Sequence, residues 1–295
     1  MQPTREPEEN NMANARPAPI TQKQVAAFLK PRPKDSHKGL FGAVTVIGGS
    51  AGMVGAALLA GRAALKMGAG CVHVGILADN APSVDLMQAE LMLHSAGNAL
   101  KSTMPDVLAV GCGLGHSLAA QKVLYDALLL DVPMVLDADA LNLIALRPDL
   151  RAMLHTRKAP AVFTPHPGEA ARLLAISTED VQKDRAAAAR DLAQRLGGSV
   201  VLKGAGSICV TRDGKLHLNQ TGNPGMSSAG MGDVLAGMIA AFMAQGLSPD
   251  EALLLGVHLH GAAGDELAKQ QATLGMSATE VTEWARWLLN RIAPN

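Results

Sequence analysis

Short apolar runs rich in β-branched residues alternate along this chain with longer stretches in which Ala and Leu recur at the helical period. The first unit joins the run at 43–47, the turn Gly48-Gly49-Ser50 and an Ala/Leu-rich stretch at 55–67 that Gly68 closes. The pattern predicts further strands at 72–77, 107–110, 134–136, 162–164, 200–202, 208–211 and 216–218, with a hairpin turn at Asp213-Gly214. It predicts helices at 21–30, ended by Pro31 and Pro33, at 117–130, from Asp139 to Leu146, and at 233–245, 249–270 and 278–291.

Repeated strand–helix units with Gly-rich turns after the strands predict an α/β fold, in which helices flank a mostly parallel central sheet on both faces. In such sheets the ligand-binding loops gather at the carboxyl ends of the strands. We expect a single domain over residues 21–295. Residues 1–20 are polar and rich in Pro, Asn and Glu, which predicts a disordered tail, and Met12 is an alternative start to Met1.

Composition narrows the classes of function. Lys plus Arg and Asp plus Glu number 26 each, so no global field favours nucleic acid or an anionic membrane surface. Aromatic residues make up only 2%, too few for the stacking platforms of single-strand binders. The N-terminal residues do not fit a secretory signal or a membrane span, and the widely spaced Cys71, Cys112 and Cys209 predict buried thiols in a reducing cytoplasm. Apolar surface on the Ala/Leu/Met-rich helices makes a homo-oligomer, such as a tetramer, plausible.

The strongest candidate for chemistry is the segment 223–233, which runs directly into an apolar helix pattern. Gly230 and Gly232 let a ligand approach the backbone, and the following helix offers free amides at the positive end of its dipole, as an anion such as a phosphoryl group requires. Asp233 beside this loop is placed to take a proton from a hydroxyl that is being phosphorylated. The alternative is a simple helix cap, which would not require so many glycines.

Two other glycine-containing loops are ambiguous on their own. The segment 48–55 follows a strand, but its spacing is not that of a dinucleotide loop, and a tight strand-to-helix turn explains it equally well. Lys203-Gly204-Ala205-Gly206-Ser207 follows a buried strand and places one cation beside a flexible loop. It suits a nucleotide phosphate, and it also suits a hairpin.

Polar residues at two further strand ends are candidate ligand contacts. In Thr164-Pro165-His166-Pro167-Gly168-Glu169 two prolines hold the backbone around His166, which favours a ligand contact over a merely structural histidine. Helix capping explains Asp139, whereas Asp137 has no evident local partner and remains a candidate for a metal or substrate contact. His258 and His260 lack the spacing of a zinc motif and are predicted to serve in packing or to support the site, so we assign no metal ligand.

Taken together, these motifs resemble the ADP/ATP-dependent NAD(P)H-hydrate dehydratases, which belong to the ribokinase-like superfamily and also form the carboxyl-terminal half of bifunctional nicotinamide-nucleotide repair enzymes. The resemblance covers about 21–292 and implies a three-layer ribokinase-like fold. Six motifs carry it, in order: Lys38-Gly39 with Val46-Ile47-Gly48-Gly49-Ser50, Val110-Gly111-Cys112-Gly113-Leu114-Gly115, Leu136-Asp137-Ala138-Asp139-Ala140-Leu141-Asn142, Thr164 to Glu169, Leu202-Lys203-Gly204-Ala205-Gly206, and Gly230-Met231-Gly232-Asp233-Val234-Leu235-Ala236-Gly237.

The resemblance implies a repair reaction, in which the S epimer of hydrated NADH or NADPH returns to working cofactor while ADP, or ATP, gives up a phosphoryl group. Asp233 would deprotonate the ring hydroxyl, and the amides of Gly230 to Gly232 would hold the phosphoryl group. Phosphate would then leave as the ring nitrogen supplies electrons. Mg²⁺ is expected because phosphoryl transfer generally uses it, and a separate NAD(P)H-hydrate epimerase would act in the same pathway.

Site residues of the family transfer by matching motif. They are Ala43, Gly115, His166 and Asp233 for the hydrate, and Lys203, Gly204, Ala205, Gly206, Ser207 and Gly232 for the nucleotide. Met231 stands where the family often has Ser or Thr, and Ser207 stands where the family often has Thr. The change at Ser207 leaves the choice of phosphoryl donor open. Two other functions compete: a ribokinase-like kinase that phosphorylates a small vitamin precursor with ATP, and a nucleotide-sensing protein without turnover. The His-Pro-Gly-Glu loop favours the dehydratase over the kinase, and Asp233 beside an anion hole disfavours the sensor.

Overall fold

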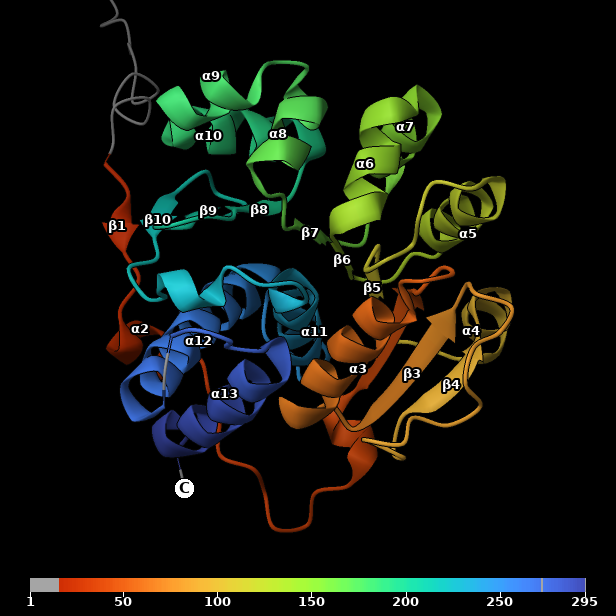
Figure 1. Cartoon of the computed structure of the whole chain (residues 1–295), viewed down its shortest axis with the longest axis horizontal. Coiled ribbons are helices and arrows are strands. Elements are labelled where there is room, and N and C mark those ends of the chain that lie inside the picture. Colours follow the sequence, from red (N-terminus) through yellow and green to blue (C-terminus); the bar gives the residue numbers. More distant parts are fainter. Residues whose placement is uncertain (1–15, 272, 295) are drawn as a thin grey trace, which may run out of the picture.

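A ten-stranded sheet forms the centre of the computed structural model, which describes residues 16–271 and 273–294 (Figure 1). All neighbouring strands are parallel except β9, which runs antiparallel to both of its neighbours. The strand order across the sheet is β1 (Ala18–Pro19), β10 (Leu216–Leu218), β9 (Ile208–Val210), β8 (Ser199–Leu202), β7 (Ala161–Phe163), β6 (Met134–Leu136), β5 (Val107–Val110), β2 (Ala43–Gly48), β3 (Cys71–Ile76) and β4 (Met92–Ser95).

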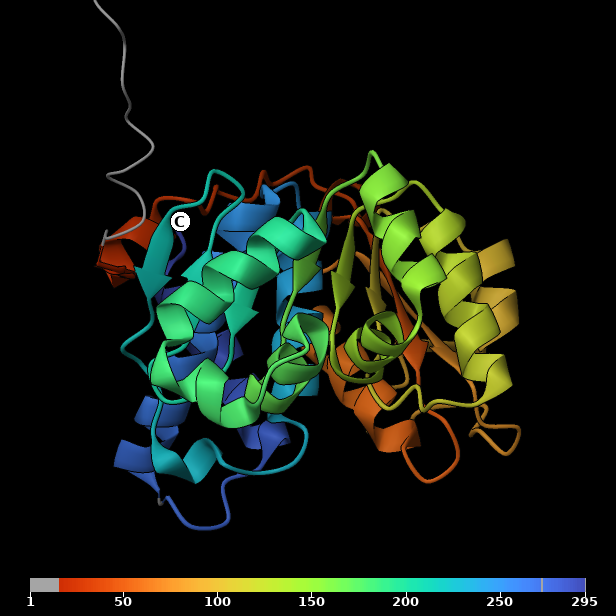
Figure 2. The same ribbon diagram turned by 90° about the horizontal axis from the view of Figure 1, so that it is seen from above.

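Helices cover both faces of the sheet, so the molecule has three layers (Figures 1 and 2). One layer holds α2 (Gln22–Ala26), α3 (Val54–Lys66), α11 (Met231–Ala244), α12 (Pro249–Gln270) and α13 (Ala278–Ile292). The other holds α4 (Ala96–Ser102), α5 (Leu118–Leu129), α6 (Ala138–Leu146), α7 (Pro148–Thr156), α8 (Pro167–Leu174), α9 (Thr178–Lys183) and α10 (Arg185–Leu196). Short 3-10 turns lie at Lys38–Phe41 and Pro224–Met226.

The central strands contribute to two separate cores because their side chains alternate between the faces. In β5, Val107 and Ala109 pack with the layer of α3 and α11, whereas Leu108 and Val110 pack with the layer of α5 and α6. Burial on both faces explains why the strands read as unbroken apolar runs rather than as alternating patterns. No helix in the described part of the chain is both long and apolar enough to cross a membrane.

The α/β fold with a mostly parallel sheet is confirmed, and most predicted elements lie within one or two residues of the observed ones. The first helix is an exception, because it ends at Ala26 rather than at residue 30. Elements that the pattern did not reveal are β1, β4, α4 and the four helices between 148 and 196. Cys112 and Cys209 are buried free thiols as predicted, whereas Cys71 is only half-buried.

The predicted N-terminal tail falls for the most part outside the described residues. Its last residues are part of the fold, since Ala18 and Pro19 pair with His217 and Leu218 of β10 and Ile20 is buried. The folded domain therefore includes a few residues before position 21.

Candidate active site

Asp233 lies in the first turn of α11. The helix begins at Met231, and Gly230 takes the N-cap position with a φ of 89° and no side-chain cap. The first intrahelical donor is the amide of Val234, which bonds the carbonyl of Gly230 at 3.0 Å, so the amides of Met231, Gly232 and Asp233 precede the helical ladder. Asp233 therefore does not act as the cap that the alternative interpretation required, and the helix end has the form of an anion site.

A buried ion pair stands opposite this helix end. Lys203 Nζ lies 2.7 Å from Asp137 Oδ1, and the two side chains are 19% and 2% exposed. Thr164 Oγ1 also donates to Asp137 Oδ1 at 2.7 Å, which provides the partner that the sequence did not suggest for Asp137. Burial alone would lower the pKa of Lys203, but the carboxylates of Asp137 and Glu169 outweigh it and hold that pKa above its usual value.

Gly232 joins the ion pair to the helix end. A Cβ on Gly232 would lie 3.0 Å from Lys203 Nζ and 3.4 Å from Asp137 Oδ2. The backbone of α11 therefore approaches both charged groups closely only because this residue has no side chain. One cation and a set of free amides converge at this point, as binding of a phosphoryl group requires.

Asp233 is surrounded by groups that shift its ionisation. Burial, and then the negative charge of Asp137, raise the pKa of Asp233 to about 6. Burial, followed by the negative charges of Asp233 and Asp137, raises the pKa of the Cys112 thiol well above its usual value. A carboxylate with a pKa near neutrality is suited to act as a general base.

Ligand atoms of Cys112, Asp137 and Asp233 lie within 4.8 Å of one another. This donor set does not fit Mg²⁺, which prefers oxygen ligands, because the thiol is kept protonated and Asp137 is already neutralised by Lys203. We assign no protein ligand to a metal.

His166 and Glu169 form a capping box at the start of α8. The amides of Gly168 and Glu169 donate to His166 Nδ1 at 3.0 and 3.4 Å, and the amide of His166 donates to Glu169 Oε2 at 2.7 Å. Burial, and then Lys203, lower the pKa of His166, so its ring is neutral and half-exposed at the edge of the site. Burial raises the pKa of Glu169 to about 7. His166, between the two prolines of this loop, therefore caps α8 and is at the same time a candidate ligand contact.

Gly115 lies in the loop after β5, where its amide donates to Asp139 Oδ2 at 2.8 Å. Asp139 thus holds a neighbouring loop instead of capping its own helix, which corrects the sequence interpretation. The residue before it, Ala138, has a φ of 49°, a conformation that is unfavourable for a residue with a side chain. Such backbone strain tends to occur at functional sites.

Ala43 does not join this group. It is the first residue of β2, and its amide bonds Asp106 Oδ2 at 2.7 Å. The other predicted residues follow the carboxyl ends of β5 to β8 or lie at the start of α11. Strand β2 has six residues and spans about 20 Å. Ala43, at the amino end of this strand, therefore lies far from the carboxyl ends of the strands, where the other predicted residues gather.

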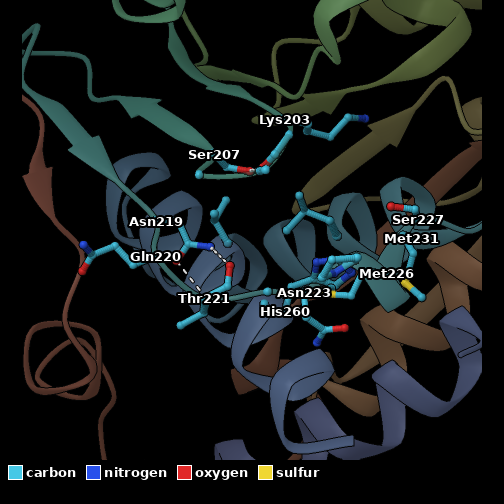
Figure 3. A pocket seen from close by; sticks show the side chains of 18 of the residues that line it. Lys203, Ser207, Asn219, Gln220, Thr221, Asn223, Met226, Ser227, Met231 and His260 are labelled. Carbon is cyan, nitrogen blue, oxygen red and sulfur yellow. Dashed lines mark hydrogen bonds between the residues drawn. The ribbon is translucent and has the colours of Figure 1, made fainter. Parts of the chain in front are cut away.

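A cavity of about 460 Å³ opens beside Lys203 and Gly232 (Figure 3). Its lining includes all six predicted nucleotide contacts, Lys203, Gly204, Ala205, Gly206, Ser207 and Gly232. Ser207 Oγ closes its own loop by donating to the carbonyl of Gly204 at 3.0 Å, and Met231 adds an apolar wall. The size suits a mononucleotide-sized ligand.

The opposite wall of the cavity was predicted only in part, through the segment from residue 223 onward and through His260. It comes from the segment after β10, from α11 and from α12, where the lining residues are Asn219, Gln220, Thr221, Gly222, Asn223, Pro224, Met226, Ser227, Leu235, Val257, His260 and Gly261. Thr221 Oγ1 donates to Asn219 Oδ1 and to the carbonyl of His258, which ties the segment to α12. Burial lowers the pKa of His260 to about 4, so its ring is neutral. The run of polar residues directly after β10 was a sequence pattern that could have predicted this part of the cavity wall.

Comparison with known proteins points to one family. The family model of the NAD(P)H-hydrate dehydratases matches residues 44–286. The ADP-dependent (S)-NAD(P)H-hydrate dehydratase of Neisseria meningitidis is 43% identical over 269 residues, which are 90% of each chain. The bifunctional NAD(P)H-hydrate repair enzyme Nnr of Escherichia coli is also 43% identical over 90% of this chain, which spans only 51% of that enzyme.

A solved structure is similar along the whole fold. The ADP/ATP-dependent NAD(P)H-hydrate dehydratase of Bacillus subtilis, crystallised with ATP and Mg²⁺, superimposes with a TM-score of 0.84 at 31% identity. The superposition covers 93% of this chain and 98% of the other. The order of the motifs, the three-layer fold and the family match agree, and the chain belongs to the NAD(P)H-hydrate dehydratase family.

Proposed function

We propose that this protein repairs nicotinamide nucleotides by dehydrating the S epimer of hydrated NADH or NADPH at the expense of ADP, which yields AMP and phosphate. The observation that carries the proposal is the convergence of Asp233, the free amides at the start of α11 and Lys203 beside a cavity of about 460 Å³. A base, an anion hole and a cation at one point are the parts that phosphoryl transfer to a hydroxyl requires.

In the first step the hydroxyl oxygen of the hydrated ring attacks the terminal phosphorus of ADP. Asp233 accepts the hydroxyl proton, the new O–P bond forms, and the bond to the leaving AMP oxygen breaks. The amides of Gly230, Met231 and Gly232 and the ammonium of Lys203 stabilise the charge on the transferring group.

In the second step the phosphorylated ring loses phosphate. The ring nitrogen supplies the electron pair that expels the phosphate, the neighbouring carbon loses a proton, and the ring double bond is restored. His166 and Gly115, on loops at the same edge of the sheet, are the contacts we assign to the hydrate. Ala43 was also expected to contact it, and its place at the start of β2 leaves that contact a prediction.

ADP occupies the cavity of Figure 3, with its phosphates toward the loop from Lys203 to Ser207 and the start of α11. ATP is the alternative donor. Mg²⁺ accompanies the phosphates, where it would neutralise charge on the transferring group, and the protein supplies no ligand that we assign to it.

The test is absorbance near 340 nm, the band of the reduced nicotinamide, on mixing the protein with hydrated NADH, Mg²⁺ and either ADP or ATP. We expect a rise that needs the nucleotide, and the nucleotide that gives the faster rise names the donor. Folded protein that gives no rise with either nucleotide would contradict the dehydratase and would favour the small-molecule kinase or the sensor without turnover.

The pH dependence of kcat/KM should show an acid limb near pH 6. Asp233 accepts a proton only when ionised, and burial raises its pKa to about 6, so activity should fall about tenfold for each pH unit below that value. Initial rates between pH 5 and pH 9 measure it. The limb should stay in place in Glu169→Gln, and a limb that disappears in that variant would instead belong to Glu169.

Replacing Gly232 by Ala should lower kcat/KM for ADP by roughly 10²-fold, because the new Cβ would crowd Lys203 Nζ at 3.0 Å and displace the phosphate site. Gly97→Ala is the matched control, since a Cβ at that helical glycine meets no atom within 4 Å. Steady-state rates at varied ADP measure the effect. Equal kinetics in the two variants would argue against a phosphate beside Gly232.

The partners follow from the same proposal. This chain spans about half the length of the bifunctional relatives. We propose that a separate NAD(P)H-hydrate epimerase supplies the S epimer, and that the reaction takes place in the cytoplasm. Leu118, Leu129 and Leu146 are 83%, 62% and 68% exposed, which supports a homo-oligomer that light scattering after size-exclusion chromatography would test.

A further inference from the structure

Arg185, the first residue of α10, lies against the loop that follows β8. Its Nη1 donates to the carbonyl of Ala205 at 2.5 Å, and its Nη2 donates to the carbonyls of Leu202 and Lys203 at 3.2 and 3.3 Å. A Cβ on Gly204 would lie 2.9 Å from that Nη2, so the backbone of the loop packs directly on the guanidinium. One side chain therefore holds three backbone carbonyls at the carboxyl end of β8.

These bonds fix the direction in which two amides of the loop point. A trans peptide unit is planar, so its N–H and its C=O point in opposite directions, and the described part of the chain contains no cis peptide bond. The carbonyl of Lys203 shares its peptide unit with the amide of Gly204. The carbonyl of Ala205 shares its unit with the amide of Gly206. Since both carbonyls point at Arg185, both amides point away from it.

The two amides lie on the cavity side of the loop. The loop forms one wall of the cavity, and α11 and α12, which belong to the layer opposite α10, contribute to the other wall (Figure 3). Amides that point away from α10 therefore face the space between the walls. Neither the amide of Gly204 nor that of Gly206 has a hydrogen-bond partner among the described residues. Free amides at such a bend form a concave site for an anion.

Arg185 also supplies a positive charge behind the loop. Burial is the one effect that shifts the pKa of Arg185, which it lowers, and a guanidinium stays charged at neutral pH. Within residues 16–271 and 273–294 no carboxylate forms an ion pair with it. The charge of Lys203, by contrast, is shared with Asp137 at 2.7 Å. The charge of Arg185 reaches the cavity through the peptide units that it polarises.

We propose that Arg185 is a positioning residue for the phosphate groups of the nucleotide, because it holds the carbonyls of the loop so that the amides of Gly204 and Gly206 face the cavity. Arg185 is not among the residues that line the cavity, so it acts through the loop rather than by touching the nucleotide. The proposal rests on the proposed function in that it takes ADP as the occupant. Lysine cannot replace this arginine, since a compact ammonium lacks the rigid fork of donors that reaches several carbonyls at once.

Arg157 provides a matched control for the experiment. Its Nη1 donates to the carbonyls of Leu128 and Leu130, both at 2.6 Å, and its Nη2 donates to the carbonyl of Val132 at 2.5 Å. This arginine also holds three carbonyls, but they precede β6 and lie at the amino end of the strands, away from the cavity. Its replacement removes the same kind of contact without touching the proposed phosphate loop.

We expect Arg185→Lys to raise the Kd and the KM for ADP roughly tenfold, while the KM for hydrated NADH changes less than about twofold. Arg157→Lys should leave the Kd for ADP unchanged. Calorimetry measures the Kd, steady-state rates measure the two KM values, and urea denaturation of both variants measures the stability that each arginine contributes. A Kd for ADP that is unchanged in Arg185→Lys, or that rises equally in Arg157→Lys, would overturn the proposal.

The wild-type protein allows a second test, which does not depend on the folding of a variant. The sequence contains two Lys-Gly pairs, Lys38-Gly39 and Lys203-Gly204, so lysine labelled with ¹³C at the carbonyl together with ¹⁵N-glycine isolates two amide signals. On addition of ADP the amide proton of Gly204 should move downfield as it binds a phosphate oxygen, and that of Gly39 should not. An unmoved Gly204 signal in protein that binds ADP would overturn the proposal. A moved signal in protein that does not convert hydrated NADH would overturn only the proposed dehydratase function.

Discussion

Asp233→Asn should lower kcat by about 10²- to 10⁴-fold, the usual contribution of a general base. The amide is nearly isosteric with the carboxylate, and Asp233 does not cap α11, so the helix should keep its start at Met231. The measurement is the rate of absorbance increase near 340 nm with hydrated NADH, ADP and Mg²⁺. Affinity for ADP, measured by calorimetry, should change little, because the amides of the first turn remain in place.

The control for this variant is Glu283→Gln on α13, which removes a carboxylate that is 49% exposed and pairs only with surface cations. It should retain the wild-type rate. Asp233→Asn protein with more than a tenth of the wild-type kcat would exclude Asp233 as the base.

Lys203→Met should lower the free energy of unfolding by about 3 kcal/mol or more, because it leaves the carboxylate of Asp137 buried without its cation. The 2.7 Å pair has side chains only 19% and 2% exposed, so the carboxylate of Asp137 itself has almost no contact with solvent. The variant should also lose ADP binding. Urea denaturation and calorimetry measure the two effects.

The double variant Lys203→Met with Asp137→Asn separates stability from function. It removes both charges and should recover much of the lost free energy of unfolding, while ADP binding stays weak because the cation is still absent. Recovery of ADP affinity in the double variant would show that Lys203 serves only to neutralise Asp137.

The regular elements could be predicted where the apolar pattern was strong. Strand β5 and α12 were both predicted with their observed bounds, the helix because Ser248 before Pro249 is a clear helix start. The helices α7 to α10 were missed, and α10, which is rich in Ala and Arg, is less apolar overall than predicted helices such as α12. Strand β1 has two residues, too few for any periodicity, and depends on pairing with β10.

The site was predictable where one segment carries the chemistry and less so where distant residues combine. Gly230 to Asp233 and Lys203 to Ser207 were identified locally and now lie together beside one cavity. The partnership of Asp137 with Lys203 joins residues 66 apart, and no local pattern reveals it. Cys112 looked like an ordinary buried thiol, because its place within 4.8 Å of carboxylate oxygens of Asp137 and Asp233 depends on how α11 packs against the loop after β5.

The placement of Gly232 and Asp233 as consecutive residues has a consequence for the order of events in catalysis. The amide that we propose holds the phosphate and the carboxylate that we propose takes the proton are separated by one peptide unit, about 3.8 Å between Cα atoms, within a single helical turn. Covalent geometry therefore fixes the offset between phosphoryl donor and acceptor before either ligand arrives. Aligning the two reactants does not require a hinge between these groups, and either ligand is able to bind first without altering their register.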